Sequence, residues 1–403
     1  MNVMTYQFFK FLDKPSTPSP NYNAFTKDYS SSDQQLNLLV VAGTFYDKGF
    51  AIGYHFSEGI IYSIHRIFRF SEKIGMGKNH IKLSRCELEK LAVEIHKNVP
   101  LHHLEELKGI IDGCQKAGHP IDPVEFFTAI SYFEINEQFC CSMFTMNPPC
   151  SLQDTIHVSN SEYPYKLNLE SHPLLLIHYP LDKNGKKAGL TYFSSGVVGI
   201  IGSLNGINEK SVTISQIRAT FLKGSLSMKG IPYPYLINDI LLNCQNAKES
   251  VEYLKDQAKT NPKFYLFSDN LKKTDSLQLV FSTPEYTLNY TDNEMIDSDL
   301  ISEKEFGFYA PLKNVIYWYD MVSQFVNGGP KVALDAILPK YGTFNCERAL
   351  EVTKALGSRY LTLSALYNTT SYEAWFSYAT PGCSADKKDY VYIDLKPYLK
   401  PTI

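Results

Sequence analysis

No stretch of this 403-residue chain is long and apolar enough to cross a membrane. The longest apolar runs, Leu36–Ala42 and Leu174–Ile177, are far below the roughly 20 residues that a spanning helix needs. The first 20 residues also lack the basic start and the apolar centre of a standard secretory signal. These absences predict a protein without a membrane span and favour a soluble, cytoplasmic one.

An excess of positive charge is missing as well. Lys and Arg number 39 against 42 for Asp and Glu, which gives a net charge of −3. The basic residues are scattered, without a stripe or a recognition-helix pattern. Proteins that bind nucleic acid cluster such residues, because much of their affinity comes from phosphate contacts. We therefore do not expect nucleic acid as a partner.

The signature motifs of several common enzyme classes are absent. The sequence contains no glycine-rich phosphate loop, no HExxH helix and no GxSxG elbow, which excludes kinases, zincins and α/β-hydrolases. Its eight cysteines form no CxxC pair and have no histidines at zinc-finger spacing. No metal site is predicted from such a pattern.

The first third of the chain carries helical signals. Residues 1–35 are rich in Ser, Pro, Asn and Asp and predict a poorly ordered arm, and the β-rich run Leu36–Phe45 predicts a strand. Apolar residues at helical spacing, a capping box that begins at Ser84 and a proline behind an Asp cap indicate the helices that follow. The predicted helices cover Tyr46–Phe70, Ser84–Lys97, Leu101–Lys116 and Asp122–Ile135.

After Cys140 the pattern changes to short β-rich segments separated by Pro, Gly and Asn turns. One amphipathic helix is predicted over Pro234–Ala258, and the clearest strands are Lys263–Ser268, Ser276–Ser282 and Leu361–Tyr367. Helices followed by a strand-rich region favour an α+β protein with packed sheets.

This change of pattern divides the chain into three parts. The arm (1–35) comes first, a mainly helical segment (36–140) follows, and a strand-rich segment (141–403) completes the chain. No internal repeat is visible, so the change near residue 140 is the one domain boundary that we predict.

Two adjacent cysteines, Cys140 and Cys141, lie at this boundary. A cysteine at the start of a strand is a natural position for a nucleophile. If the peptide bond before it is cut, the new α-amino group lies beside the thiol, and with a pKa of about 7.7–8.0 it can take the thiol proton. Such a nucleophile needs no histidine. The alternative is that both cysteines are buried thiols without a catalytic role.

Seven segments of the sequence follow one another in an order that is typical of one enzyme family. They are VAGTFYDKGFAIGYHF, LEELKGIIDGCQKAG, CSMF, IHVSNSEYPY, SGVVGIIGSLNGINEKSVTIS, the helix Pro234–Ala258 and LSALYNTTSYEAWFSYATPG. In this order the chain resembles the acyl-coenzyme A:isopenicillin N acyltransferase family of N-terminal-nucleophile hydrolases. Relatives of that family include acid ceramidase, N-acylethanolamine acid amidase and the choloylglycine hydrolases.

The resemblance implies a fold and a maturation step. The fold would be a four-layer αββα sandwich, with two antiparallel sheets between helices. Self-cleavage before Cys141 would turn the segment 36–140 into the α-subunit of an α/β heterodimer. Ser142 follows Cys141, where the family has Thr or Ser after its nucleophile. The resemblance therefore assigns the nucleophile to Cys141 and not to Cys140.

The resemblance also implies the other site residues. Asn160 falls on the Asn of the family's Arg-Asn-x-Asp motif, while Ser159 stands at the Arg position and Glu162 at the Asp position. Glu162 and Asn160 would orient the α-amino group. Asn293, or Asn289 as the second choice, would stabilise the oxyanion, a contribution worth about 3–4 kcal/mol when the donor is well placed.

The implied reaction is attack of the Cys141 thiolate on a linear amide, an N-acyl bond, of a small molecule, lipid-like substrates included. Water or an amine would resolve the acyl-enzyme, so hydrolase and acyltransferase both remain open. No metal or organic cofactor is implied. Two alternative functions stay open: ligand binding by a non-catalytic relative of the same fold, and lipid hydrolysis by a phospholipase-B-like enzyme. The replacements at Ser159 and Glu162 are what favour the non-catalytic relative.

Overall fold

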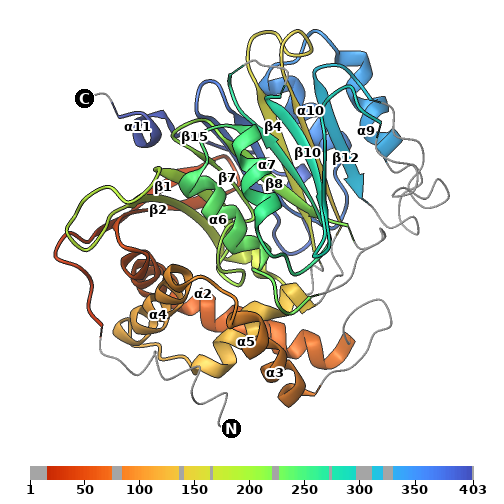
Figure 1. The fold of residues 1–403 in the computed structure, drawn as a ribbon. Helices are drawn as coiled ribbons and strands as arrows, with labels where there is room; N and C mark the ends of the chain where they lie inside the picture. Colours follow the sequence, from red (N-terminus) through yellow and green to blue (C-terminus); the bar gives the residue numbers. More distant parts are fainter. Residues whose placement is uncertain are drawn as a thin grey trace.

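The computed structural model describes residues 16–74, 84–135, 140–163, 167–219, 227–271, 275–295, 311–320 and 330–401. Within these residues the strands form two sheets that pack face to face, and helices cover both outer faces (Figure 1). The predicted α+β class and the four-layer αββα sandwich are therefore confirmed. Among the helices of the described ranges, none is long and apolar enough to cross a bilayer.

The larger sheet has nine strands in the described residues. Their order is β1 (Asn23–Ser30), β2 (Gln35–Gly43), β5 (Pro173–Pro180), β6 (Tyr192–Val197), β7 (Asn205–Asn208), β8 (Thr213–Arg218), β9 (Lys263–Ser268), β10 (Leu277–Ser282) and β11 (Thr287–Tyr290). Seven neighbouring pairs are antiparallel, but β2 pairs with β5 in parallel. The prediction of two purely antiparallel sheets is thus wrong at this one pair. The chain makes a long helical excursion between these two strands, as a parallel connection requires.

The smaller sheet has six strands in the same ranges, and all of its pairs are antiparallel. Their order is β12 (Val315–Asp320), β3 (Cys140–Met146), β4 (Ile156–Glu162), β13 (Leu361–Asn368), β14 (Glu373–Tyr378) and β15 (Val391–Asp394). The strand β3 lies second from the edge, between β12 and β4. It faces β8 and β9 of the larger sheet.

Helices cover the larger sheet on its outer face. These are α2 (Phe45–Ile74), α3 (Arg85–His96), α4 (Leu101–Lys116), α5 (Pro123–Ile135), α6 (Tyr233–Asn243) and α7 (Ala247–Asp256). The smaller sheet is covered by α9 (Pro330–Ile337) and α10 (Cys346–Ala355), and α11 (Lys396–Leu399) follows β15 near the C-terminus (Figure 1). The four helices predicted before residue 140 and the three named strands after it are confirmed within a few residues.

Two predicted elements differ from the structure. Residues 23–30, expected in a poorly ordered arm, form the edge strand β1 against β2, because backbone pairing is available to a polar strand as well as to an apolar one. The predicted helix Pro234–Ala258 is two helices, since Asn246 has extended backbone angles and caps α7 by accepting a hydrogen bond from the backbone N–H of Glu249. A capping residue outweighs continuous apolar periodicity at this point.

The helices α2 and α4 touch backbone to backbone through four glycines. A Cβ at Gly49 would lie 1.9 Å from the carbonyl oxygen of Glu106, and one at Gly109 would lie 2.2 Å from that of Tyr46. Gly53 and Gly113 repeat this contact one turn further along both helices. Any side chain there would force the helices apart, which explains why glycines recur four residues apart in both segments.

We expect Gly109→Ala to destabilise the protein, although alanine favours a helix over glycine by about 1 kcal/mol. Overpacking of this kind costs typically about 1–3 kcal/mol, and here the obstacle is backbone, which cannot move aside. Urea denaturation followed by circular dichroism would measure the loss. Gln115→Ala, at an exposed position of the same helix, is the control. A Gly109→Ala protein as stable as this control would contradict the backbone contact.

Candidate functional site

Cys141 lies at the beginning of β3, on the face of the smaller sheet that packs against the larger one. Side chains alternate along a strand, so Cys141 shares this inner face with Met143, whose Sδ atom accepts a hydrogen bond from the Ser215 hydroxyl of β8 at 3.6 Å. The Cys141 side chain is 5% exposed. The candidate nucleophile is thus enclosed between the two sheets at one end of β3.

A small cavity adjoins Cys141 at this end of the sandwich. It measures about 30 Å³, room for about one or two water molecules. The side chains that line it and carry polar groups are Ser161, Glu162, Tyr163, Gln216, Arg218, Tyr233 and Lys263. They come from β4 and the residue after it, β8, α6 and β9, elements that are far apart in the sequence.

The two tyrosines keep neutral hydroxyls beside the thiol. Burial raises the pKa of Tyr163 well above its ordinary value, and the neighbouring Glu170 and Cys141 raise it further. Burial likewise raises the pKa of Tyr233, together with Glu134 and Cys141. Both phenols are therefore hydrogen-bond donors at neutral pH.

Two buried cations stand beside the same cavity. The Lys263 ammonium lies 4.5 Å from the ring centroid of Tyr233, and the Lys263 and Arg218 side chains are 5% and 7% exposed. Glu134 lies on the other side of Lys263, and it accepts hydrogen bonds from the Tyr233 backbone N–H at 3.0 Å and from the Thr260 hydroxyl at 2.6 Å. Burial raises the pKa of Glu134, against the opposing effect of Lys263. Two cationic side chains and the Glu162 carboxylate therefore line the same cavity as the thiol.

Asn160 points away from Cys141. It is an even-numbered residue of β4, opposite Ser142, and therefore lies on the outer face of the sheet. Its amide donates to the Ser142 hydroxyl at 3.0 Å and accepts from the Ser364 hydroxyl at 2.6 Å. The structure brings Asn160 to the residue after the nucleophile and not to the thiol.

Glu162 is next to the nucleophile along the ladder. It pairs with Cys140, one residue before Cys141, and it contributes to the wall of the small cavity. Its side chain is 2% exposed and accepts a hydrogen bond from the Ser358 hydroxyl at 2.9 Å. The structure therefore brings Glu162 close to the backbone of Cys140 and Cys141. Its carboxylate is held by the hydrogen bond from Ser358.

Asn293 and Asn289 are far from Cys141. Asn293 is exposed in a turn beside Asp292, which accepts a hydrogen bond from the Asn314 backbone N–H. Asn314 in turn contacts Asn147, which follows the last residue of β3. Six residues of strand separate Cys141 from Asn147, a distance of about 20 Å, so Asn293 lies near the other end of β3.

Asn289 is an exposed residue of β11, and its amide donates to the Gln278 side chain at 3.4 Å. Neither Asn289 nor Asn293 lines the cavity at Cys141. The structure therefore brings neither predicted oxyanion donor to the nucleophile. Gln216 lines that cavity instead, and no local motif in the sequence marks it.

A much larger cleft shares a wall with the small cavity. It measures about 1190 Å³ and is lined by Arg66, Arg69, Arg359 and Lys387, among tyrosines and the loop 379–384. Thr362 lines this cleft and donates a hydrogen bond to the backbone oxygen of Ser161, which lines the cavity at Cys141.

The charge of this cleft is strongly positive. Its one carboxylate in the described lining is Glu170, whose pKa burial raises to about 7 while Arg66 opposes the shift. Part of its negative charge is therefore neutralised near neutral pH. Four cations facing one partly protonated carboxyl group give a cleft that attracts anions.

Comparison with known proteins finds no matching family model and no matching curated protein. Among solved structures, the chain is similar to an N-acylethanolamine-hydrolyzing acid amidase ortholog of Caenorhabditis elegans (12% identity, 57% of this chain and 93% of that one, TM-score 0.41). It is also similar to penicillin V acylase from Agrobacterium tumefaciens (9%, 65% and 89%, 0.43). A variant of the conjugated bile acid hydrolase from Clostridium perfringens is a third (10%, 64% and 92%, 0.41). Likenesses at these scores say nothing of activity or of site residues.

Thiol labelling would test how closed the site is. We expect iodoacetamide to modify Cys86, which is exposed on α3, long before it modifies the buried Cys141 of the uncleaved chain, because the reagent must reach the sulfur. Mass mapping of tryptic peptides after timed labelling would give both rates. The unfolded chain in urea, where the difference should vanish, is the control. Equal rates in the native protein would show that the cavity at Cys141 is open.

Proposed function

We propose that this protein is a cysteine-nucleophile amide hydrolase or acyltransferase and that Cys141 attacks the amide carbonyl. One observation carries the proposal: Cys141 shares a small cavity with two tyrosines, a glutamine, a glutamate and two cationic side chains. Such an arrangement provides donors for the oxygen of a tetrahedral intermediate beside the thiol.

The first step is cleavage of the chain before Cys141. The thiol attacks the carbonyl of Cys140, the peptide nitrogen leaves with the proton, and water hydrolyses the resulting thioester to a carboxylate on Cys140. Cys141 then carries a free thiol and a free α-amino group. The size of the cavity, about 30 Å³, supports this order of events, because an amide substrate does not fit beside the thiol while the preceding chain remains attached.

The two fragments stay together after such a cleavage. The strands β1 and β2 precede Cys141, yet β2 pairs with β5 over six residues within the larger sheet. Glu134 of α5 also accepts a hydrogen bond from the Tyr233 backbone N–H of α6 at 3.0 Å, a contact that joins the two fragments. An α/β heterodimer, with the segment 36–140 as the α-subunit, is therefore the expected mature form.

In the mature protein the α-amino group of Cys141 takes the thiol proton, and the thiolate forms an acyl-enzyme with the substrate. The amine of the substrate leaves with that proton, and water or another amine then takes the acyl group. Glu162 lies one residue away along the ladder and orients the α-amino group. Asn160 acts through Ser142, by holding the strand that carries the nucleophile.

The Gln216 amide is the best candidate for the oxyanion donor. Its side chain is 7% exposed, lines the cavity of Cys141, and its Oε1 atom makes no hydrogen bond. The amide is therefore free to turn its N–H groups toward a negative oxygen. The neutral hydroxyls of Tyr163 and Tyr233 lie on the same cavity and complete the donor set.

The basic cleft beside the site supports an anionic substrate. An N-acyl compound with a carboxylate or phosphate fits its positive lining, and the cleft is large enough for a small molecule with an acyl chain. Water as the acceptor of the acyl group gives hydrolysis, and an amine as the acceptor gives acyl transfer.

A second candidate function is binding without catalysis. The observation that favours it is the difference in volume between the cleft and the cavity at Cys141. The cleft measures about 1190 Å³ and has room for a ligand, whereas the cavity measures only about 30 Å³. In that case the chain would remain intact and the anionic ligand would be released unchanged.

The exchange Cys141→Ala separates the two functions. We expect wild-type protein to yield a larger fragment that begins Cys-Ser-Met-Phe, and to release amine from anionic N-acyl compounds faster than from neutral ones. Cys141→Ala should give one intact chain without activity, because the nucleophile of both steps is gone. Intact-mass spectrometry and an amine-release assay measure both results. The control is Cys140→Ala, which should still cleave. An uncleaved and inactive wild-type protein that binds anions would support the binding function.

The exchange Gln216→Met tests the oxyanion donor. Loss of one such donor lowers kcat by about 10²–10³-fold, and we expect this change with little change in KM, since the interaction forms in the transition state. The control is Gln278→Met on β10, a buried glutamine that does not line the cavity. Steady-state kinetics of both variants would decide, and a normal kcat for Gln216→Met would exclude this role.

A further inference from the structure

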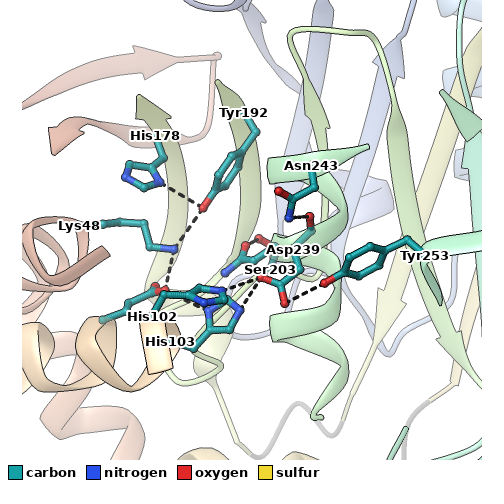
Figure 2. Close-up of polar contacts among 11 residues, drawn as sticks. Lys48, His102, His103, His178, Tyr192, Ser203, Asp239, Asn243 and Tyr253 are labelled. Carbon is teal, nitrogen blue, oxygen red and sulfur yellow. Dashed lines mark hydrogen bonds and ion pairs between the residues drawn. The ribbon is translucent and has the colours of Figure 1, made fainter. Parts of the chain in front are cut away.

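A cluster of polar side chains lies away from Cys141, where α4 meets α6. His102 and His103 begin α4, and Asp239 lies in the middle of α6 (Figure 2). The Nε2 atoms of both histidines are 2.8 Å from the same oxygen of Asp239. One ligand atom from each of the three side chains lies within 4.8 Å of the others.

We propose that His102, His103 and Asp239 bind a divalent transition-metal ion, with Zn²⁺ as the best fit. Two imidazole nitrogens and one carboxylate oxygen are a donor set that Zn²⁺ prefers. Tetrahedral ligands at about 2.0–2.1 Å from zinc are separated by about 3.3 Å. The two N···O separations of 2.8 Å would each widen by about 0.5 Å. The two imidazole nitrogens, which lie within 4.8 Å of each other, would settle at the same separation through side-chain rotation.

The surroundings of the cluster match those of a metal ligand. His103 is fully buried, and its Nδ1 atom makes no hydrogen bond but faces the Glu106 carboxylate at 3.7 Å. A histidine that binds a metal through one nitrogen commonly directs the N–H of its other nitrogen to a carboxylate. With Nε2 on the ion, Nδ1 would carry the proton and point at Glu106.

Further contacts hold the two carboxylates in place. Glu106 forms an ion pair with Lys48 at 2.6 Å, and the Lys48 ammonium also donates a hydrogen bond to the Tyr192 hydroxyl at 3.1 Å. The second oxygen of Asp239 accepts from the Tyr253 hydroxyl at 3.3 Å (Figure 2).

The position of the cluster indicates a structural ion whose fourth coordination position is open to solvent. His103 and Asp239 are buried, while the His102 side chain is 36% exposed, so water can complete the coordination. The ion would join α4, which precedes Cys141, to α6, which follows it. It would thus fasten the helical segment to the rest of the molecule whether or not the chain is cleaved.

The test uses the full-length chain, stripped with a chelator and then given Zn²⁺ alone. We expect one equivalent of zinc to remain after gel filtration and the melting temperature to rise, because binding to the folded state stabilises it. Elemental analysis and calorimetry measure the two. Co²⁺ in place of Zn²⁺ should give the visible absorption of a tetrahedral site.

Three variants locate the ion. His102→Ala, at the partly exposed ligand, should fold and lose the retained zinc and the shift in melting temperature. Asp239→Asn should lose both as well. The control His119→Ala, at an exposed histidine outside the cluster, should keep both. Absence of retained zinc in the wild type, or equal retention by His102→Ala and the control, would overturn the proposal and leave a hydrogen-bonded contact between α4 and α6.

Discussion

The parallel pairing of β2 with β5 is the contact on which the arrangement of this protein depends. It joins a strand that precedes the helical excursion to one that follows Cys141, and it places α2 and α4 over the larger sheet. The glycine contacts then fix α4 against α2 at backbone distance. Because the pairing crosses the junction at Cys141, the helical segment is part of the sandwich and not an appendage.

The candidate site follows from the alternation of side chains along β3 and β4. Cys141 faces the space between the sheets, whereas Ser142 and Asn160 face the outer helices, where their hydrogen bonds hold the strand. The thiol therefore lies on one face of β3, and the hydrogen bonds that hold the strand lie on the other. The inner face alone receives groups from β8 and β9, which is why Gln216 and Lys263 meet Cys141 there.

The sequence was informative about elements and less so about the site. The helix of residues 101–116 and the strand of residues 263–268 match their predicted bounds, because local periodicity and capping residues determine them. The resemblance assigns the oxyanion donor to Asn293, yet the structure places Asn293 at the opposite end of β3 from Cys141. The polar strand β1 was missed because pairing with β2 and not apolar content stabilises it.

What the sequence by itself determined is the α+β class and the bounds of most helices and strands, while the boundary near residue 140 and the nucleophile Cys141 stay predictions. These depend on patterns within a few residues of each other. Only the tertiary structure decided which side chains surround Cys141, that a basic cleft adjoins it, and that His102 and His103 meet Asp239. Those contacts join residues separated by up to 201 positions in the sequence, and the register and facing of two sheets, which no local pattern encodes, bring them together.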